Sequence, residues 1–220
     1  MVKEVTLSIP TSYGDISLKK WLEFQQELKN YEGDEDAITA LMLSYLCGLD
    51  SEYIPHISIE DYAMIRNELG KFINNTELPL QRFIMVNGVE YGFEPNLSNM
   101  TYGAFADITK FNTITIDDNW AKIMSILYRP VVKKVGDTYT IKAYTGDIDH
   151  KPFLELGMDI HFGCLFFFVN LSTDLLNSIL KSTMQMELPP SIKSILVKNG
   201  EHIKQLLNLQ TEISSKLTKW

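Results

Sequence analysis

The chain has 220 residues, of which 45% are hydrophobic and 22% charged, a length that fits one large domain or two small ones. Its net charge of −8 at pH 7 argues against a dedicated nucleic-acid surface, which needs a basic stripe to neutralise phosphates. The most apolar run, residues 160–171, is too short to cross a membrane, because a bilayer-spanning helix needs roughly 20 residues.

Residues 1–78 are expected to form a small N-terminal helical unit. Apolar and polar residues alternate over residues 2–9, which predicts a strand at the start of the chain. Apolar residues at helical spacing then predict three helices, over Leu18–Leu28, residues 34–46 and Ile59–Ile73. Ser58, with Asp61 three residues further on, is typical of a capping box at the start of the third helix.

Residues 79–190 are expected to hold two β-hairpins and an apolar helical core. Residues 82–86 and Val89–Phe93 should pair around Asn87-Gly88, because this dipeptide suits the positive φ angles of a type I′ turn. Residues 131–135 and 138–144 predict a second hairpin. The predicted fold class is therefore α+β, predominantly α-helical, with two β-hairpins and an N-terminal strand.

Residues 91–131 have the most distinctive composition, with closely spaced aromatic residues and a closing Tyr-Arg-Pro. Thr101 is expected to cap a short helix that runs to Asp107. A second helix should follow Asp117, Asp118 or Asn119 and end before Pro130, because proline disfavours a helical residue before it. We expect one face of this helix to be buried against the Tyr91–Phe93 part of the first hairpin. The face consists of Trp120, Ile123, Met124 and Leu127.

Arg129 is the charged residue of greatest interest, because its guanidinium group can bind a carboxylate with two parallel hydrogen bonds. Glu94 and Asp107 are the candidate partners, and an internal clamp is favoured over a ligand site. The structural or interaction candidates in this part of the chain are Tyr91, Phe93, Trp120, Tyr128 and Arg129.

The remainder of the chain is expected to be helical. Residues 152–171 form one apolar element with a break at Gly157, and Ser172 or Thr173 would cap a further helix over residues 174–187. Pro189-Pro190 separates residues 191–220, whose apolar spacing predicts an amphipathic helix. This helix either completes its own domain or docks on a second copy or another protein. Its interaction candidates are Leu206, Leu207 and Ile213.

No pattern in the sequence predicts a catalytic, cofactor-binding or metal-binding site. No two of the four histidines lie at ligand spacing on a helix, and His161 is expected to be a hydrogen-bonded core residue. Glu90 and Glu94 would share a strand face, as paired carboxylates or as part of a solvated hairpin. Cys47 and Cys164 are expected to be buried and reduced. An enzyme whose catalytic site is assembled from residues far apart in the sequence stays an alternative.

Two groups of segments resemble proteins of tailed bacteriophages. The helical plan of ISLKKWLEFQQEL, DEDAITALMLSYLCGL and ISIEDYAMIRNELGKFI is similar to that of phage tail assembly chaperones. GVEYGFEPNLSNMTYGAFADI and NWAKIMSILYRPV resemble segments of tailed-phage proteins, including those of crAss-like gut phages, with Gly-Phe-x-Pro-Asn-Leu and Leu-Tyr-Arg-Pro motifs. Together these segments span about half of the chain, and the residues after Pro190 have no counterpart in the chaperone pattern.

The resemblance implies a non-enzymatic phage morphogenesis protein that works in the host cytoplasm, without a cofactor, through protein–protein contacts. Its partners would be other phage structural or assembly proteins, or further copies of the chain. A minor virion protein that stays in the particle, as a ring, neck or cargo component, is the close alternative. A protein that inhibits a host protein is a further alternative.

Overall fold

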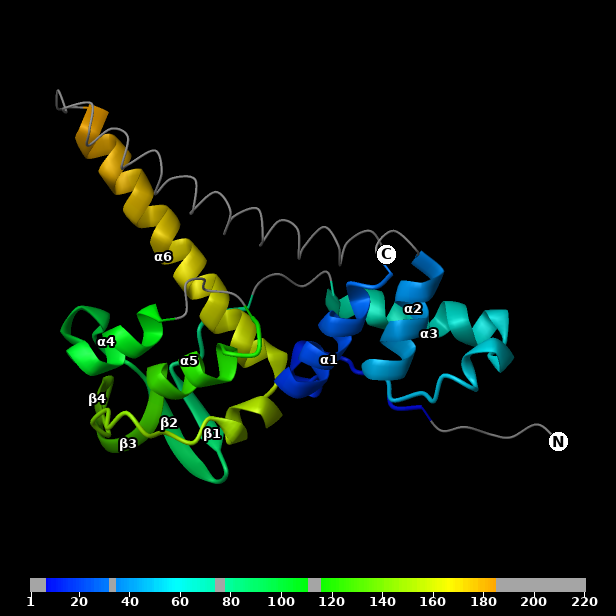
Figure 1. The fold of residues 1–220 in the computed structure, drawn as a ribbon, viewed down its shortest axis with the longest axis horizontal. Helices are drawn as coiled ribbons and strands as arrows, with labels where there is room; N and C mark the ends of the chain where they lie inside the picture. The colour runs from blue at the N-terminus through cyan, green and yellow to red at the C-terminus, as the bar shows by residue number, and fades with distance from the viewer. Residues whose placement is uncertain (1–6, 32–34, 74–77, 111–115, 185–220) are drawn as a thin grey trace.

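The computed structural model describes residues 7–31, 35–73, 78–110 and 116–184. The described residues form an α+β fold that is mostly helical and contains a four-stranded antiparallel sheet made of two hairpins, which confirms the predicted class. The described residues contain six α-helices: α1 Leu18–Leu28, α2 Glu35–Tyr45, α3 Ile59–Ile73, α4 Tyr102–Thr109, α5 Trp120–Leu127 and α6 Met158–Met184. Figure 1 shows α1–α3 in one lobe, and the sheet with α4 and α5 in the other.

The lobe formed by α1–α3 follows its sequence pattern closely. Ser17 caps α1 by accepting a hydrogen bond from the backbone N–H of Lys20, and Ser58 accepts one from the N–H of Asp61 at the start of α3. Each bond satisfies one of the donors that a helix start leaves unpaired. Residues 7–9 of the predicted N-terminal strand belong to no strand of the sheet, and residues 2–6 lie outside the described part.

The sheet has the strand order β1-β2-β3-β4, in which β1 is Phe83–Val86, β2 Val89–Phe93, β3 Tyr128–Val135 and β4 Thr138–Ile141. The first hairpin turns through Asn87 at φ 49° and Gly88 at φ 77°, which are the positive values that a type I′ turn requires. The second turns through Gly136 at φ 57°. Both predicted hairpins are therefore confirmed.

Tyr128, Arg129 and Pro130 lie in a strand, which corrects their expected place at the end of a helix. The helix α5 ends at Leu127, and Tyr128 is already extended, at φ −107° and ψ 123°. The three residues pair with Phe93, Gly92 and Tyr91 of β2, in that order. Proline disfavours the helical conformation in the residue before it, which here is Arg129. Pro130 therefore stops the helix and also favours the extended conformation of the strand.

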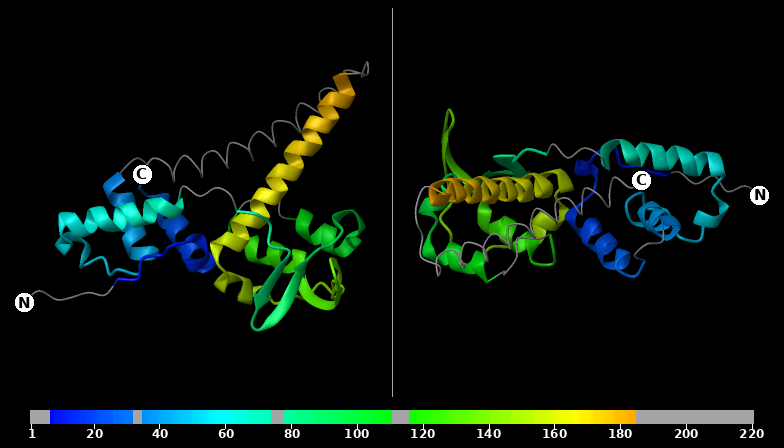
Figure 2. Two further views of the ribbon diagram at one scale, coloured as in Figure 1. Left: turned by 180° about the vertical axis from the view of Figure 1, so that it is seen from behind. Right: turned by 90° about the horizontal axis from the view of Figure 1, so that it is seen from above.

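The helix α6 is continuous from Met158 to Met184, which corrects the prediction that Ser172 or Thr173 starts a separate helix. The Thr173 hydroxyl donates to the carbonyl of Val169 at 2.8 Å, so this side chain bonds inside the helix instead of capping a new one. The break expected at Gly157 is present, and η4 (Lys151–Glu155) precedes it. Beyond the sheet-containing lobe, α6 projects away from the body of the molecule (Figures 1 and 2).

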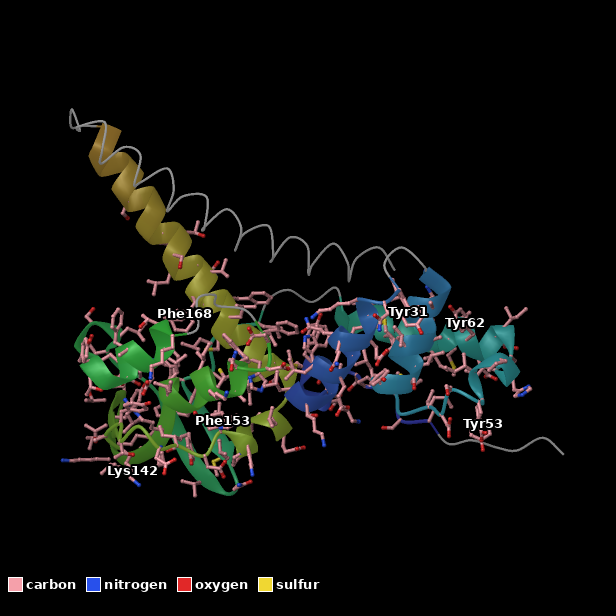
Figure 3. All side chains as sticks on the ribbon, viewed as in Figure 1. Tyr31, Tyr53, Tyr62, Lys142, Phe153 and Phe168 are labelled. Carbon is pink, nitrogen blue, oxygen red and sulfur yellow. The ribbon has the colours of Figure 1, made fainter. Side chains whose placement is uncertain are left out.

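The two lobes meet where residues 16–18 lie against residues 156–158. The N–H of Leu18 donates to the carbonyl of Leu156 at 3.0 Å, and the N–H of Met158 donates to Ile16 at 2.8 Å. On the same boundary, the rings of Trp21 and Phe162 meet edge to face, with centroids 5.2 Å apart. Side chains fill both lobes (Figure 3), and most of the buried apolar ones form one hydrophobic cluster. The division expected at residue 78 stays a prediction, and residues 191–220 lie outside the described part.

Candidate interaction surface

Most of the residues singled out by sequence lie inside the fold. Phe93, Trp120, Tyr128 and Arg129 are buried, and Tyr91 is half-buried against the ring of Phe153. The expected burial of Ile123, Met124 and Leu127 with Trp120 is also confirmed. Leu206, Leu207 and Ile213 lie outside the described residues.

Trp120 is held in the core by the predicted core histidine. Its indole Nε1 donates to Nδ1 of His161 at 3.1 Å, and Nε2 of the same ring lies 3.1 Å from the carbonyl oxygen of Phe153. Since Nδ1 accepts, Nε2 carries the proton and donates to Phe153. Burial lowers the pKa of His161 to about 4, although the backbone hydrogen bonds oppose this shift. The ring is therefore neutral and fully occupied with structural hydrogen bonds.

Arg129 pairs inside the fold with Glu94, one of its two expected partners, but through one guanidinium nitrogen and not through the two parallel hydrogen bonds that were expected. Nη2 of Arg129 binds Oε2 of Glu94, with side-chain exposures of only 7% and 10%. The second carboxylate oxygen of Glu94 accepts a 3.4 Å hydrogen bond from the N–H of Asn96. Nε of Arg129 is buried and has no hydrogen-bond partner. The pair joins the central strand β3 to the residue that follows β2.

Asp107, the other candidate partner, instead ties α4 to the chain that follows β4. The hydroxyl of Tyr144 donates to Asp107 at 2.5 Å, and Lys110 binds the other carboxylate oxygen at 2.5 Å. Hydrogen bonds from Lys110 and Tyr144 lower the pKa of Asp107. Burial, together with the Asp107 carboxylate, raises the pKa of Tyr144 to about 12. The Tyr144 ring also lies beside Gly103, so α4 is attached at both of its ends.

The outward side of α4 carries the most exposed aromatic residue of the described chain. Tyr102 is 85% exposed and Phe105 is 56% exposed, whereas Ala104 on the opposite side of the helix is fully buried. Thr109, which is also exposed, continues the same face at the next turn. We call Tyr102, Phe105 and Thr109 the α4 surface. A helix tied to the chain after β4 by the Tyr144–Asp107 hydrogen bond thus holds two aromatic side chains in solvent.

Sequence reasoning did not single out Tyr102 or Phe105, although the pattern contains the signal. Ala104 and Ile108 lie four residues apart and mark the side of α4 that faces the core. Tyr102, Phe105 and Thr109 lie three and four residues apart on the other side. Aromatic residues opposite the buried stripe of an amphipathic helix are the feature that would have identified this surface.

Glu90 and Glu94, the possible carboxylate pair near the sheet, each have a structural partner. Glu90 binds Lys134 at 2.8 Å and Glu94 binds Arg129, so each carboxylate of the possible pair faces its own cation. In the described part of the chain, no three His, Cys, Asp or Glu side chains gather where they could hold a metal ion. Cys47 and Cys164 are buried and free, as expected, and burial raises the pKa of both thiols.

No protein-family model, curated protein or solved structure matches the chain. Among the described helices, none has the length and apolar character needed to cross a membrane. Within the described residues, the α4 surface combines exposed aromatic side chains with a fixed helix, which is the combination typical of a protein-binding surface.

Proposed function

We propose that the chain is a non-enzymatic phage assembly protein, similar to tail assembly chaperones, that binds another phage structural or assembly protein through the α4 surface. The observation that carries the proposal is the exposure of Tyr102 and Phe105 on a helix whose opposite side holds the fully buried Ala104 and the partly buried Ile108. The resemblance of residues 88–108 and 119–131 to tailed-phage segments includes α4 itself and the strands around it.

The surroundings of α4 suit a binding surface. Aromatic side chains bring large contact areas at a small entropic cost, and they are enriched among the residues that dominate binding energies. The Arg129–Glu94 pair and the Tyr144–Asp107 bond fix the neighbouring backbone before a partner arrives. A surface fixed in advance loses less conformational freedom on binding, which favours affinity.

A minor virion structural protein is the second candidate, because it would use the same kind of surface. The two candidates differ in what happens to the chain. A chaperone leaves the finished particle, and a ring, neck or cargo component stays in it. Mass spectrometry of purified virions separates them, and peptides at stoichiometric levels would rule out the chaperone form.

The α4 surface is tested by the double substitution Tyr102→Ser with Phe105→Ser. A tagged chain should capture identified phage structural or assembly proteins from infected cells, and the double variant should lose them. The matched control is Ile59→Ser with Met64→Ser, which removes two exposed apolar side chains of α3 and should keep the partners. Equal capture by all three chains would exclude the α4 surface as the binding site.

A further inference from the structure

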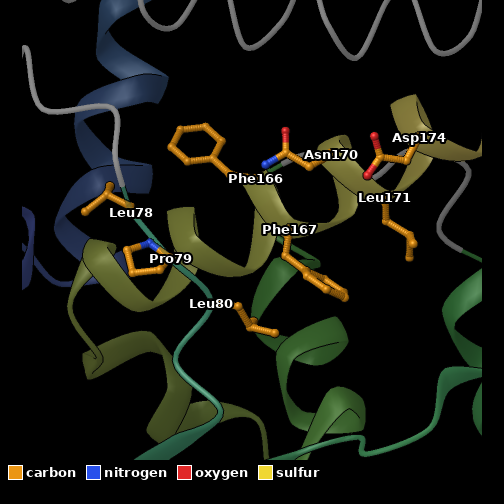
Figure 4. A pocket seen from close by; sticks show the side chains of 8 residues that line it. All are labelled: Leu78, Pro79, Leu80, Phe166, Phe167, Asn170, Leu171 and Asp174. Atoms are coloured by element: carbon orange, nitrogen blue, oxygen red, sulfur yellow. The ribbon is translucent and has the colours of Figure 1, made fainter. Parts of the chain in front are cut away.

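An open groove runs along α6, with a volume of about 260 Å³. Residues 78–80 form one wall, and Phe166, Phe167 and Leu171 of α6 line the other, with Asp174 at one end (Figure 4). Leu171 is among the exposed large apolar residues. The described part of the chain thus leaves an apolar strip of α6 uncovered where this helix emerges from the body.

The groove has rigid walls. A Cβ atom at Gly163 would lie 2.5 Å from the carbonyl oxygen of Pro79, so only glycine lets the residue 78–80 segment lie this close to α6. The segment continues into Gln81, whose Nε2 donates to Asp159 at 2.7 Å and whose carbonyl accepts from Tyr128 at 2.7 Å. The walls of the groove are therefore held in place by contacts that the described residues make with one another.

We infer that this groove is the seat of the chain's own C-terminal segment, residues 191–219, lying antiparallel along α6. Charge is the first argument. Residues 191–220 contain five lysines and two glutamates, a net charge of +3, and since the whole chain carries −8, residues 1–190 carry −11. A basic segment is attracted to such an acidic body, and Asp174, at one end of the groove, is one of its carboxylates.

Chain length and register give the second argument. Pro189-Pro190 prevents α6 from continuing as a regular helix, and an antiparallel return about this turn brings positions equally far from it to the same level, since both helices rise about 1.5 Å per residue. Residues 208–213 then lie level with residues 166–171. Ile213, which lies on the apolar stripe of the segment, falls beside Phe166 and Phe167, and Leu207 lies one residue from the level of Leu171.

A cross-link within the full chain tests this register. Asn170 is exposed on α6, and the return brings position 209 level with it. The variant Asn170→Cys with Leu209→Cys should form an intramolecular disulfide with oxidised glutathione, seen as faster migration of the monomer on a non-reducing gel. The control pair, Asn170→Cys with Lys193→Cys, should not, because position 193 would lie about 24 Å further along the helix.

Other outcomes identify other occupants or overturn the inference. Disulfide-linked dimers without the intramolecular product would mean that a second copy fills the groove, and equal cross-linking of both pairs would mean that the segment has no fixed seat. A second measurement is the thiol reactivity of Leu171→Cys, which should rise several-fold when Leu206→Glu and Leu207→Glu are added. An unchanged rate would overturn the inference. Neither experiment involves the α4 surface.

Discussion

Trp120 and His161 are fully buried side chains from different helices, and a single 3.1 Å hydrogen bond joins Nε1 of the indole to Nδ1 of the imidazole. The bond links α5 to α6 under the sheet. It also requires a neutral ring, because a protonated imidazole has no acceptor nitrogen left for the indole. Two testable consequences arise from this contact, one in the pH dependence of stability and one in the effect of removing the indole.

The first prediction concerns acidification. The pKa of His161 is lowered from 6.5 to about 4, so the unfolded chain binds a proton at a higher pH than the folded chain. The contribution to stability is complete above pH 6.5 and is lost as the pH falls towards 4, by roughly 3 kcal/mol at most. Chemical denaturation at a series of pH values measures this loss.

The control variant for acidification is His161→Gln, which cannot titrate. It should be less stable at neutral pH and should show a smaller loss between pH 6.5 and 4. Asp15, whose pKa is lowered mainly by hydrogen bonds from Thr11, loses its contribution below about pH 4 and so leaves the window clear. The same pH slope in the variant and the parent protein would contradict the assignment to His161.

The second prediction concerns the indole itself. Trp120→Ala should lower the free energy of unfolding by about 3–5 kcal/mol, the usual effect of emptying a buried aromatic site. Trp120→Phe keeps the ring but leaves Nδ1 of His161 unpaired, which should cost about 1–3 kcal/mol. Tyr102→Ala is the exposed control and should change stability by less than about 0.5 kcal/mol. A loss below about 1 kcal/mol for Trp120→Ala would contradict its place in the core.

The elements that depend on local signals could be predicted from the sequence. Asn87-Gly88 specified its hairpin, and the caps at Ser58 and Thr101 stand where the pattern indicated, because turns and caps are set by the residues that form them. The core face of α1 was also readable, since its burial follows helical periodicity. In α5 the predicted face is buried, but so is every other residue except Lys122.

The elements that depend on tertiary partners could not be predicted. Residues 128–130 form a strand because β2 lies beside them. The local sequence does not predict which strand they pair with. Thr173 continues α6 by bonding the carbonyl of Val169, an alternative to capping that the residue type alone does not decide. The α4 surface, in contrast, depends on a local pattern. Tyr102 and Phe105 lie on the side of the helix opposite Ala104 and Ile108, and the sequence contains that spacing.

The third prediction concerns the buried ion pair. Arg129→Lys should destabilise the protein by about 1–2 kcal/mol, because the compact ammonium of lysine is more strongly hydrated than a guanidinium and so is harder to bury, and Arg129→Met should cost about 3–5 kcal/mol by leaving Glu94 buried without a cation. The matched control is Lys134→Met at the exposed pair with Glu90, worth at most about 1 kcal/mol. Thermal unfolding compares the three variants. Equal effects at the two sites would show that burial of the Arg129 pair is not what matters.

The fourth prediction concerns two helical glycines. Gly163→Ala should lower stability by about 1–3 kcal/mol, because the added methyl group would strike the Pro79 carbonyl oxygen. In α3, Gly70→Ala meets nothing within 4 Å and should stabilise by up to about 1 kcal/mol, since alanine is the better helix former. Urea denaturation of both variants measures the contrast. Stabilisation by Gly163→Ala would mean that the residue 78–80 segment does not press on α6.

The hydrogen bonds that join residues 16–18 to residues 156–158 set an order of events during translation. The α1 side chains Leu18 and Trp21 cannot complete their packing until α6 has left the ribosome, since Trp21 packs on Phe162. At roughly 5–20 residues per second, the nascent chain holds these apolar side chains uncovered for on the order of ten seconds. During this interval of synthesis the N-terminal lobe exposes apolar side chains that promote aggregation. The same side chains are a surface that a cellular chaperone can bind.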